Sequence, residues 1–81
     1  MHEQIDEKIE VIVKFKESEI FPHFFRWSGR VYKVERVNMV HKERDGNDTI
    51  YYFSVSDKAN FFRLAFFTRD LSWRIQEVFC K

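Results

Sequence analysis

Histidine and cysteine are the side chains with which this chain could most directly hold a metal ion or attack a substrate. The three histidines, His2, His23 and His41, are scattered along the sequence, and the single cysteine is Cys80. No two of them have the spacing of a metal-binding motif, and a structural zinc ion needs four ligands. No serine stands in a recognisable nucleophile motif either. We therefore expect no metal, no cofactor and no catalytic residue, and hence a protein that is not an enzyme.

The glycines and the loop aspartates are better explained as turn formers than as parts of a reaction site. Gly29 and Gly46 are the only two glycines of the chain, too few for a phosphate-binding loop. Gly46 stands in the run Asp-Gly-Asn-Asp at 45–48, and Asp57 begins another polar run. Aspartate, asparagine and glycine favour turns because their side chains or backbone tolerate the required conformations. These carboxylates are therefore predicted to shape turns.

Paired aromatic residues give the strongest indication of binding chemistry. The pairs are Phe24-Phe25, Tyr51-Tyr52, Phe61-Phe62 and Phe66-Phe67. Neighbouring residues of a strand point to opposite faces, so one ring of each pair must leave the core. With Phe25, Tyr51, Phe62 and Phe66 inward, the outward rings are Phe24, Tyr52, Phe61 and Phe67. With nearby arginines, the predicted binding residues are Phe24, Arg26, Arg30, Tyr52, Phe61, Arg63 and Phe67.

Two kinds of partner suit such a surface, and a third interpretation removes the surface altogether. A second copy of the chain, as in a homodimer, or another protein would bury the outward rings. Alternatively, single-stranded nucleic acid would stack its bases on the rings and place phosphates near arginines such as Arg69. In the third interpretation, the N-terminal segment or a connector covers the rings. Residues 1–20 hold six acids and three lysines, whereas residues 21–81 hold seven acids and eleven bases. A balance of +4 is small for a nucleic-acid binder, so we expect a protein partner or self-association.

The hydrophobic pattern predicts strands along most of the chain. At 8–16, alternate residues are apolar, which is the period of a strand. Ser28 and Gly29 separate two alternating runs and predict a hairpin. A connector at 17–22 ends in Pro22, and further strands are predicted at 49–56, 60–68 and 71–80. The fold class is therefore all-β, with about six antiparallel strands in a meander-like small barrel or strongly rolled sheet.

Length and composition indicate one small domain. The 81 residues are 44% hydrophobic and 19% aromatic, which excludes a disordered chain. We expect a flexible N-terminus at 1–7 and a single β domain at 8–81. No apolar stretch approaches the roughly 20 residues that span a bilayer, and the acidic start does not resemble a signal peptide. One cysteine makes no internal disulfide, so we expect a cytoplasmic protein without membrane contact.

The aromatic and apolar residues follow a longer pattern that is similar to a known family. The pattern is Phe25-x-Trp27-x-Gly29-Arg30-x-Tyr32-x-Val34-x-x-Val37, then Tyr51-x-Phe53-x-Val55, Phe62-x-Leu64 and Trp73-x-Ile75. Over residues 20–81 it resembles a family of small uncharacterised bacterial β domains. Related segments occur at the C-terminus of some inactive relatives of Y-family DNA polymerases. The resemblance implies an accessory role, with a possible DNA-repair context, and transfers no catalytic residue.

Overall fold

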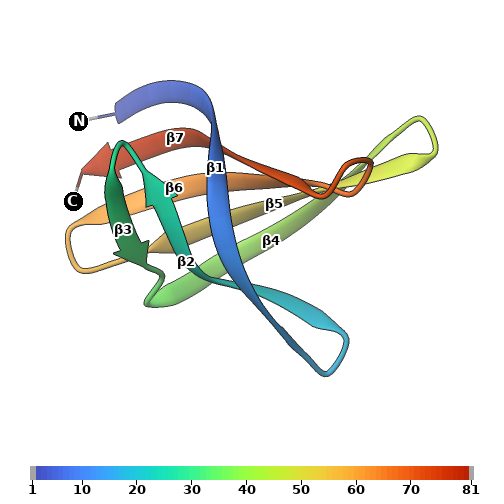
Figure 1. The fold of residues 1–81 in the computed structure, drawn as a ribbon, viewed down its shortest axis with the longest axis horizontal. Coiled ribbons are helices and arrows are strands. Elements are labelled where there is room, and N and C mark those ends of the chain that lie inside the picture. Colours follow the sequence, from blue (N-terminus) through green and yellow to red (C-terminus); the bar gives the residue numbers. More distant parts are fainter. Residues whose placement is uncertain (1, 81) are drawn as a thin grey trace.

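Seven strands make up nearly all of the chain in the structure, a computed structural model that describes residues 2–80. They are β1 (His2–Lys16), β2 (Glu19–Trp27), β3 (Arg30–Lys33), β4 (Arg36–Asp45), β5 (Asp48–Ser56), β6 (Asn60–Phe67) and β7 (Ser72–Cys80) (Figure 1). The all-β prediction is confirmed, and the strand beyond the six expected is β4. Its second half is almost entirely charged because β4 lies at an edge with both faces open to water.

The strands form a single antiparallel sheet that is rolled but not closed. Their order is β3-β2-β1-β7-β6-β5-β4, so β3 and β4 are the two edges. Consecutive strands pair throughout, except that β3 and β4 do not pair and β1 pairs with β7 instead. The β3–β4 connection is held at both sides, because Val34 N–H donates to His23 C=O and Glu35 N–H donates to Ser56 C=O. The sheet is therefore the rolled form of the two predicted shapes.

Strand β1 is long and belongs to both halves of the sheet. Its first part pairs with β7 as far as Ile9, which lies opposite Trp73, and its second part pairs with β2 from Glu10 onward. A bulge interrupts the β1–β7 ladder, and Asp6 within it has a φ of 69°. The strand begins at His2, whereas the alternation at 8–16 predicted a later start. The division into a flexible segment at 1–7 and a domain at 8–81 stays a prediction.

The core lies where the two halves of the rolled sheet face each other. Phe25 of β2 meets Phe62 of β6 with ring centroids 5.0 Å apart, and Tyr32 of β3 meets the same ring at 5.3 Å. The largest fully buried side chains are Phe25, Phe53, Val55, Leu64 and Ile75. Each buried Phe, Leu or Ile contributes roughly 1.5–3 kcal/mol. Phe25 and Phe62, both predicted to point inward, therefore lie at the centre of the core.

Two tight turns join β1 to β2 and β2 to β3, and the sequence pattern predicts only the second of them. The turn at Ser28 and Gly29 has φ angles of 53° and 76°, which confirms that hairpin. The turn at Glu17 and Ser18 also has two positive φ angles, 53° and 66°, without a glycine. The predicted connector at 17–22 is therefore wrong, because β2 already begins at Glu19. Buried Pro22 lies within β2, beside the irregularity where the β1–β2 register shifts.

Between residues 2 and 80 the chain forms no helix, and so none that could cross a membrane.

Candidate functional site

Six of the seven predicted binding residues divide between two surfaces, and Arg30 belongs to neither. Phe24 and Arg26 lie on β2 and Arg30 on β3, whereas Tyr52, Phe61, Arg63 and Phe67 lie on β5 and β6. The inner faces of these two parts pack against each other in the core, so their outer faces point away from each other (Figure 1). A single partner site made from all seven residues is therefore not what the structure forms.

The first surface, here called the β5–β7 outer face, consists of Tyr52, Phe61, Arg63, Phe67 and Phe79. Phe61 and Phe79 are directly opposite each other on β6 and β7, and they are 43% and 38% exposed. His2 of β1 lies opposite Phe79 and stacks on its ring at a centroid distance of 4.1 Å. The start of β1 therefore covers Phe79 only in part.

The middle of the β5–β7 outer face is more closed than its end. Ala65, which the alternation places between Arg63 and Phe67, is fully buried between its cross-strand neighbours Tyr52 and Arg74. Tyr52 and Phe67 are themselves only half-exposed. The accessible apolar area is thus concentrated at Phe61 and Phe79. Phe79 was missed in the sequence, although its alternation with buried Val78 pointed outward.

A polar network surrounds Tyr52 on this face. The Arg63 guanidinium lies over the Tyr52 ring, 4.8 Å from its centroid, and His41 stacks near the same ring at 6.2 Å. Partial burial raises the pKa of the Tyr52 hydroxyl, and the Glu43 carboxylate raises it further by charge and by a hydrogen bond, while Arg63 opposes the shift. Glu43 also lies 3.4 Å from His41 Nε2. Tyr52 is therefore held as a neutral, hydrogen-bonded group.

Most charges around the β5–β7 outer face have a partner within the chain. Arg74 Nε lies 2.7 Å from Asp6 Oδ1 and also donates, through its terminal nitrogen, to the Asp6 carbonyl at 3.0 Å. His2 Nε2 lies 3.7 Å from Glu77. Arg63, opposite Glu77 in the β6–β7 ladder, is engaged with Tyr52. This surface therefore offers aromatic rings among charges that are largely compensated.

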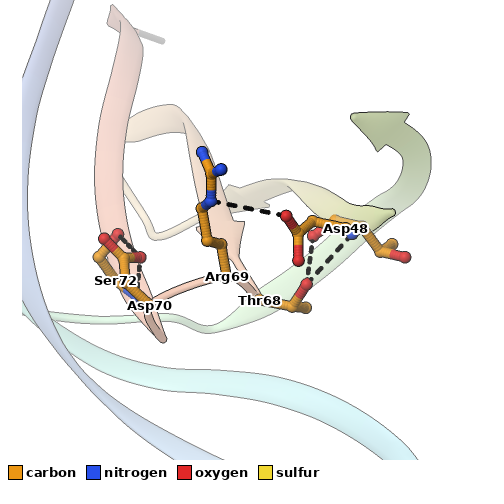
Figure 2. A network of polar contacts seen from close by, with 6 residues as sticks. Asp48, Thr68, Arg69, Asp70 and Ser72 are labelled. Carbon is orange, nitrogen blue, oxygen red and sulfur yellow. Dashed lines mark hydrogen bonds and ion pairs between the residues drawn. The ribbon is translucent and has the colours of Figure 1, made fainter. Parts of the chain in front are cut away.

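The turn between β6 and β7 is fixed by short polar contacts (Figure 2). Thr68 Oγ1 donates to Thr49 C=O at 2.8 Å and accepts from Thr49 N–H at 3.1 Å. Asp70 Oδ1 accepts from the Ser72 hydroxyl at 2.6 Å and from its N–H at 3.1 Å, and the hydroxyl bond is the main reason why the pKa of Asp70 is lowered. Arg69, a proposed phosphate contact, lies 3.6 Å from Asp48. These contacts stabilise the turn, and the same residues border a shallow hollow together with Phe67 and Arg74.

The second surface, here called the β1–β3 outer face, consists of Ile12, Lys14, Phe24, Arg26, Val31 and Lys33. In the ladders, Ile12 lies opposite Phe24, which lies opposite Lys33, and Arg26 lies opposite Val31. Arg30 is not part of this row, because it lies opposite the half-buried Trp27 and near the Tyr32 ring, at 5.8 Å. Ile12, Val31 and Lys33 were missed, since their grouping depends on which strands become neighbours.

Within residues 2–80, no three His, Cys, Asp or Glu side chains are grouped as metal ligands. Comparison of the chain with family models, with curated proteins and with solved structures gives no match.

Proposed function

We propose that this chain is a non-enzymatic interaction module that self-associates through the β5–β7 outer face. The observation that carries the proposal is the pair Phe61 and Phe79, opposite each other on neighbouring strands and 43% and 38% exposed. Covering an exposed Phe contributes up to roughly 1.5–3 kcal/mol. Phe61 and Phe79 therefore form a compact apolar centre for an interface.

A second copy of the chain is the partner that the charges favour. The Arg74–Asp6 ion pair, together with Arg63 opposite Glu77 in the β6–β7 ladder, leaves this surface nearly balanced. Two copies of a balanced surface can meet about a two-fold axis without placing unpaired like charges together. Single-stranded nucleic acid fits less well, because Arg63 already lies over Tyr52, Arg69 lies 3.6 Å from Asp48, and Arg26 and Arg30 belong to β2 and β3 on the other half of the rolled sheet. A polyanion would therefore find few available cations here.

Analytical ultracentrifugation tests the proposal. We expect the wild-type mass to rise with concentration toward that of a dimer, and Phe79→Ser to remain folded and monomeric. The matched control is Phe15→Ser, which removes an apolar ring that is 73% exposed on β1, outside this surface. A dimer that survives Phe79→Ser, or a wild type that stays monomeric at every concentration, would overturn the proposal.

The same preparations separate the nucleic-acid alternative. If single-stranded DNA is the partner, the wild type binds an oligonucleotide with an affinity that falls steeply as salt rises. Arg63→Glu should then abolish binding while circular dichroism stays unchanged. We expect instead that the oligonucleotide does not bind at the β5–β7 outer face. Wild type and Arg63→Glu should then give the same oligonucleotide titration.

A further inference from the structure

The β1–β3 outer face has an apolar centre that the fold leaves uncovered. Ile12 and Val31 are 65% and 63% exposed, and Phe24 lies between their strands on β2. A shallow hollow of about 310 Å³ is bordered by these side chains and by Arg26 and Glu10. Such a hollow admits one or two apolar side chains of a partner, and their burial would supply the affinity.

Cations without an internal partner surround this centre. Lys33 lies opposite Phe24, Arg26 lies opposite Val31, and Lys14 follows Ile12 by two residues on β1. All four ion pairs of residues 2–80 lie elsewhere, and none involves these three side chains. Glu10, opposite Arg26 in the ladder, makes no ion pair with it. Three cations thus stand against the single carboxylate of Glu10, so the net charge of this face is positive, which favours an acidic partner.

We infer that the β1–β3 outer face binds an acidic protein segment with apolar side chains at its middle. The apolar side chains would lie on Ile12, Phe24 and Val31, and the flanking carboxylates would meet Lys14, Arg26 and Lys33. This site goes beyond the proposed self-association, since it lies on the other half of the rolled sheet, across the core, and takes a different partner. Both surfaces can be occupied at once because the core separates them.

The composition of the centre favours a peptide over single-stranded nucleic acid. Binding of bases without sequence preference depends on aromatic rings that offer successive stacking platforms. Phe25, which also borders the hollow, is buried, so Phe24 is the one aromatic ring among the three outward apolar residues, and Ile12 and Val31 are branched aliphatic side chains. Aliphatic side chains bury well against leucine or phenylalanine of a partner and provide no stacking plane. The cations then select acidic flanks and speed association.

Fluorescence anisotropy with a defined probe tests this inference. The probe is a labelled synthetic peptide of about ten residues, long enough when extended to pass across the face, with a Leu-Phe pair between flanking glutamates. A second peptide carries two serines in place of Leu-Phe, and an oligothymidine of similar charge represents nucleic acid. We expect the first peptide to bind, with affinity reduced by salt, and the serine peptide to bind at least about tenfold more weakly, a loss of about 1.4 kcal/mol.

Paired variants locate the binding on the face. Arg26→Glu with Lys33→Glu should weaken the peptide by at least about tenfold, because two attractions become repulsions. The matched control is Arg36→Glu with Arg44→Glu on β4, which changes the net charge equally at exposed residues that form no ion pair. Ile12→Thr keeps a β-branched residue in the strand and should weaken binding severalfold. All variants are first compared with the wild type by circular dichroism.

Three outcomes would overturn the inference. The first is a peptide that does not bind the folded wild type. The second is equal weakening by the β4 control pair, which would reduce the effect to net charge. The third is an oligothymidine that binds more tightly than the peptide and is lost with Arg26→Glu and Lys33→Glu, which would assign the face to nucleic acid. Phe79→Ser should leave peptide binding unchanged, so failure of the dimer proposal is seen separately.

Discussion

The two outer faces are built from the same kind of alternating strand, yet they treat charge in opposite ways. Around the β5–β7 outer face, Arg74 is paired with Asp6, and Arg63 lies over Tyr52 and opposite Glu77. On the β1–β3 outer face, Arg26 and Lys33 have no ion-pair partner within residues 2–80. The comparison shows that exposed apolar residues locate a surface, whereas the pairing of the surrounding charges indicates which partner it suits.

The largest expected difference between the two halves lies in their tryptophans. Trp73, beneath the β5–β7 outer face, is 6% exposed and stacks on Phe66 at 4.7 Å. Trp73→Ala should therefore lower the free energy of unfolding by about 3–5 kcal/mol. Trp27, beneath the other face, is half-buried and its buried Nε1 has no acceptor, so Trp27→Ala should cost about 2 kcal/mol.

Urea denaturation measures both values, and Trp27→Phe is the control. Trp27→Phe loses part of the ring's packing contact, but it also removes a buried N–H donor that lacks an acceptor. The two effects oppose each other, so the free energy of unfolding should change by less than about 1 kcal/mol. Equal losses for Trp27→Ala and Trp73→Ala would mean that both halves of the sheet depend on their tryptophan alike.

A smaller effect is expected in the β2–β3 hairpin, which carries four of the six residues of the β1–β3 outer face. Gly29 has a φ of 76°, and a Cβ placed on it would contact nothing within 4 Å. Gly29→Ala should therefore cost about 1–2 kcal/mol from the backbone conformation alone.

The β1–β2 turn offers the reverse test, because Glu17→Asn with Ser18→Gly should stabilise the protein by up to about 1 kcal/mol. A destabilised turn variant in denaturant titration would contradict this account.

The paired and unpaired charges should differ in their contribution to folding. Arg74→Ala removes the 2.7 Å ion pair with Asp6 and a donor to the bulged part of β1. The pair is partly exposed and screened by solvent, so we expect a loss of about 0.5–1 kcal/mol that shrinks in high salt. Lys33→Ala should leave the midpoint of unfolding unchanged within error. If Lys33→Ala destabilised as much as Arg74→Ala, the contrast between the two faces would not hold.

The smallest effect concerns Tyr52 at alkaline pH. Because its folded pKa is raised, this hydroxyl contributes stability that is fully present below the unfolded pKa of about 10 and is lost as pH rises through the folded value. Absorbance titration of the three tyrosines should show one that ionises late, and Tyr52→Phe should remove it. Glu43→Gln should lower the pKa of the Tyr52 hydroxyl, since the Glu43 carboxylate raises that pKa by charge and by a hydrogen bond. A late titration that persists in Tyr52→Phe would assign it to another tyrosine.

The sequence predicted those parts of the fold that depend on neighbouring residues. The alternation at Phe25, Phe53 and Leu64 places them correctly in the core, and Ser28-Gly29 forms the expected turn. The turn at Glu17-Ser18 could not be found in this way, because its residue types do not favour positive φ. The sequence predicted Pro22 at the end of a connector, because proline lacks the N–H that a strand donates to its ladder. In the structure Pro22 lies within β2, where the irregularity in the β1–β2 ladder makes the missing N–H tolerable.

The candidate surfaces were predicted less completely, for a different reason. Alternation within one strand predicts which rings point outward. The residues that lie beside each ring, however, depend on which strands become neighbours in the sheet. Phe61 joins Phe79, and Ile12 joins Phe24, through ladders that the sequence does not specify. Six of the seven predicted residues are therefore divided between two surfaces on opposite sides of the molecule, and Arg30 belongs to neither.

The pairing of β1 with β7 also bears on how the protein reaches its fold. That ladder joins His2 to Phe79 and Ile9 to Trp73, so it closes the longest loops in the chain, whereas every other ladder joins consecutive strands. Read from β4 through β7 and then from β1 to β3, the sheet is a simple meander. A circular permutant opened between Val34 and Glu35, with a short linker from β7 to β1, would make every ladder local. Such a chain should fold faster than the natural order while keeping the same native contacts.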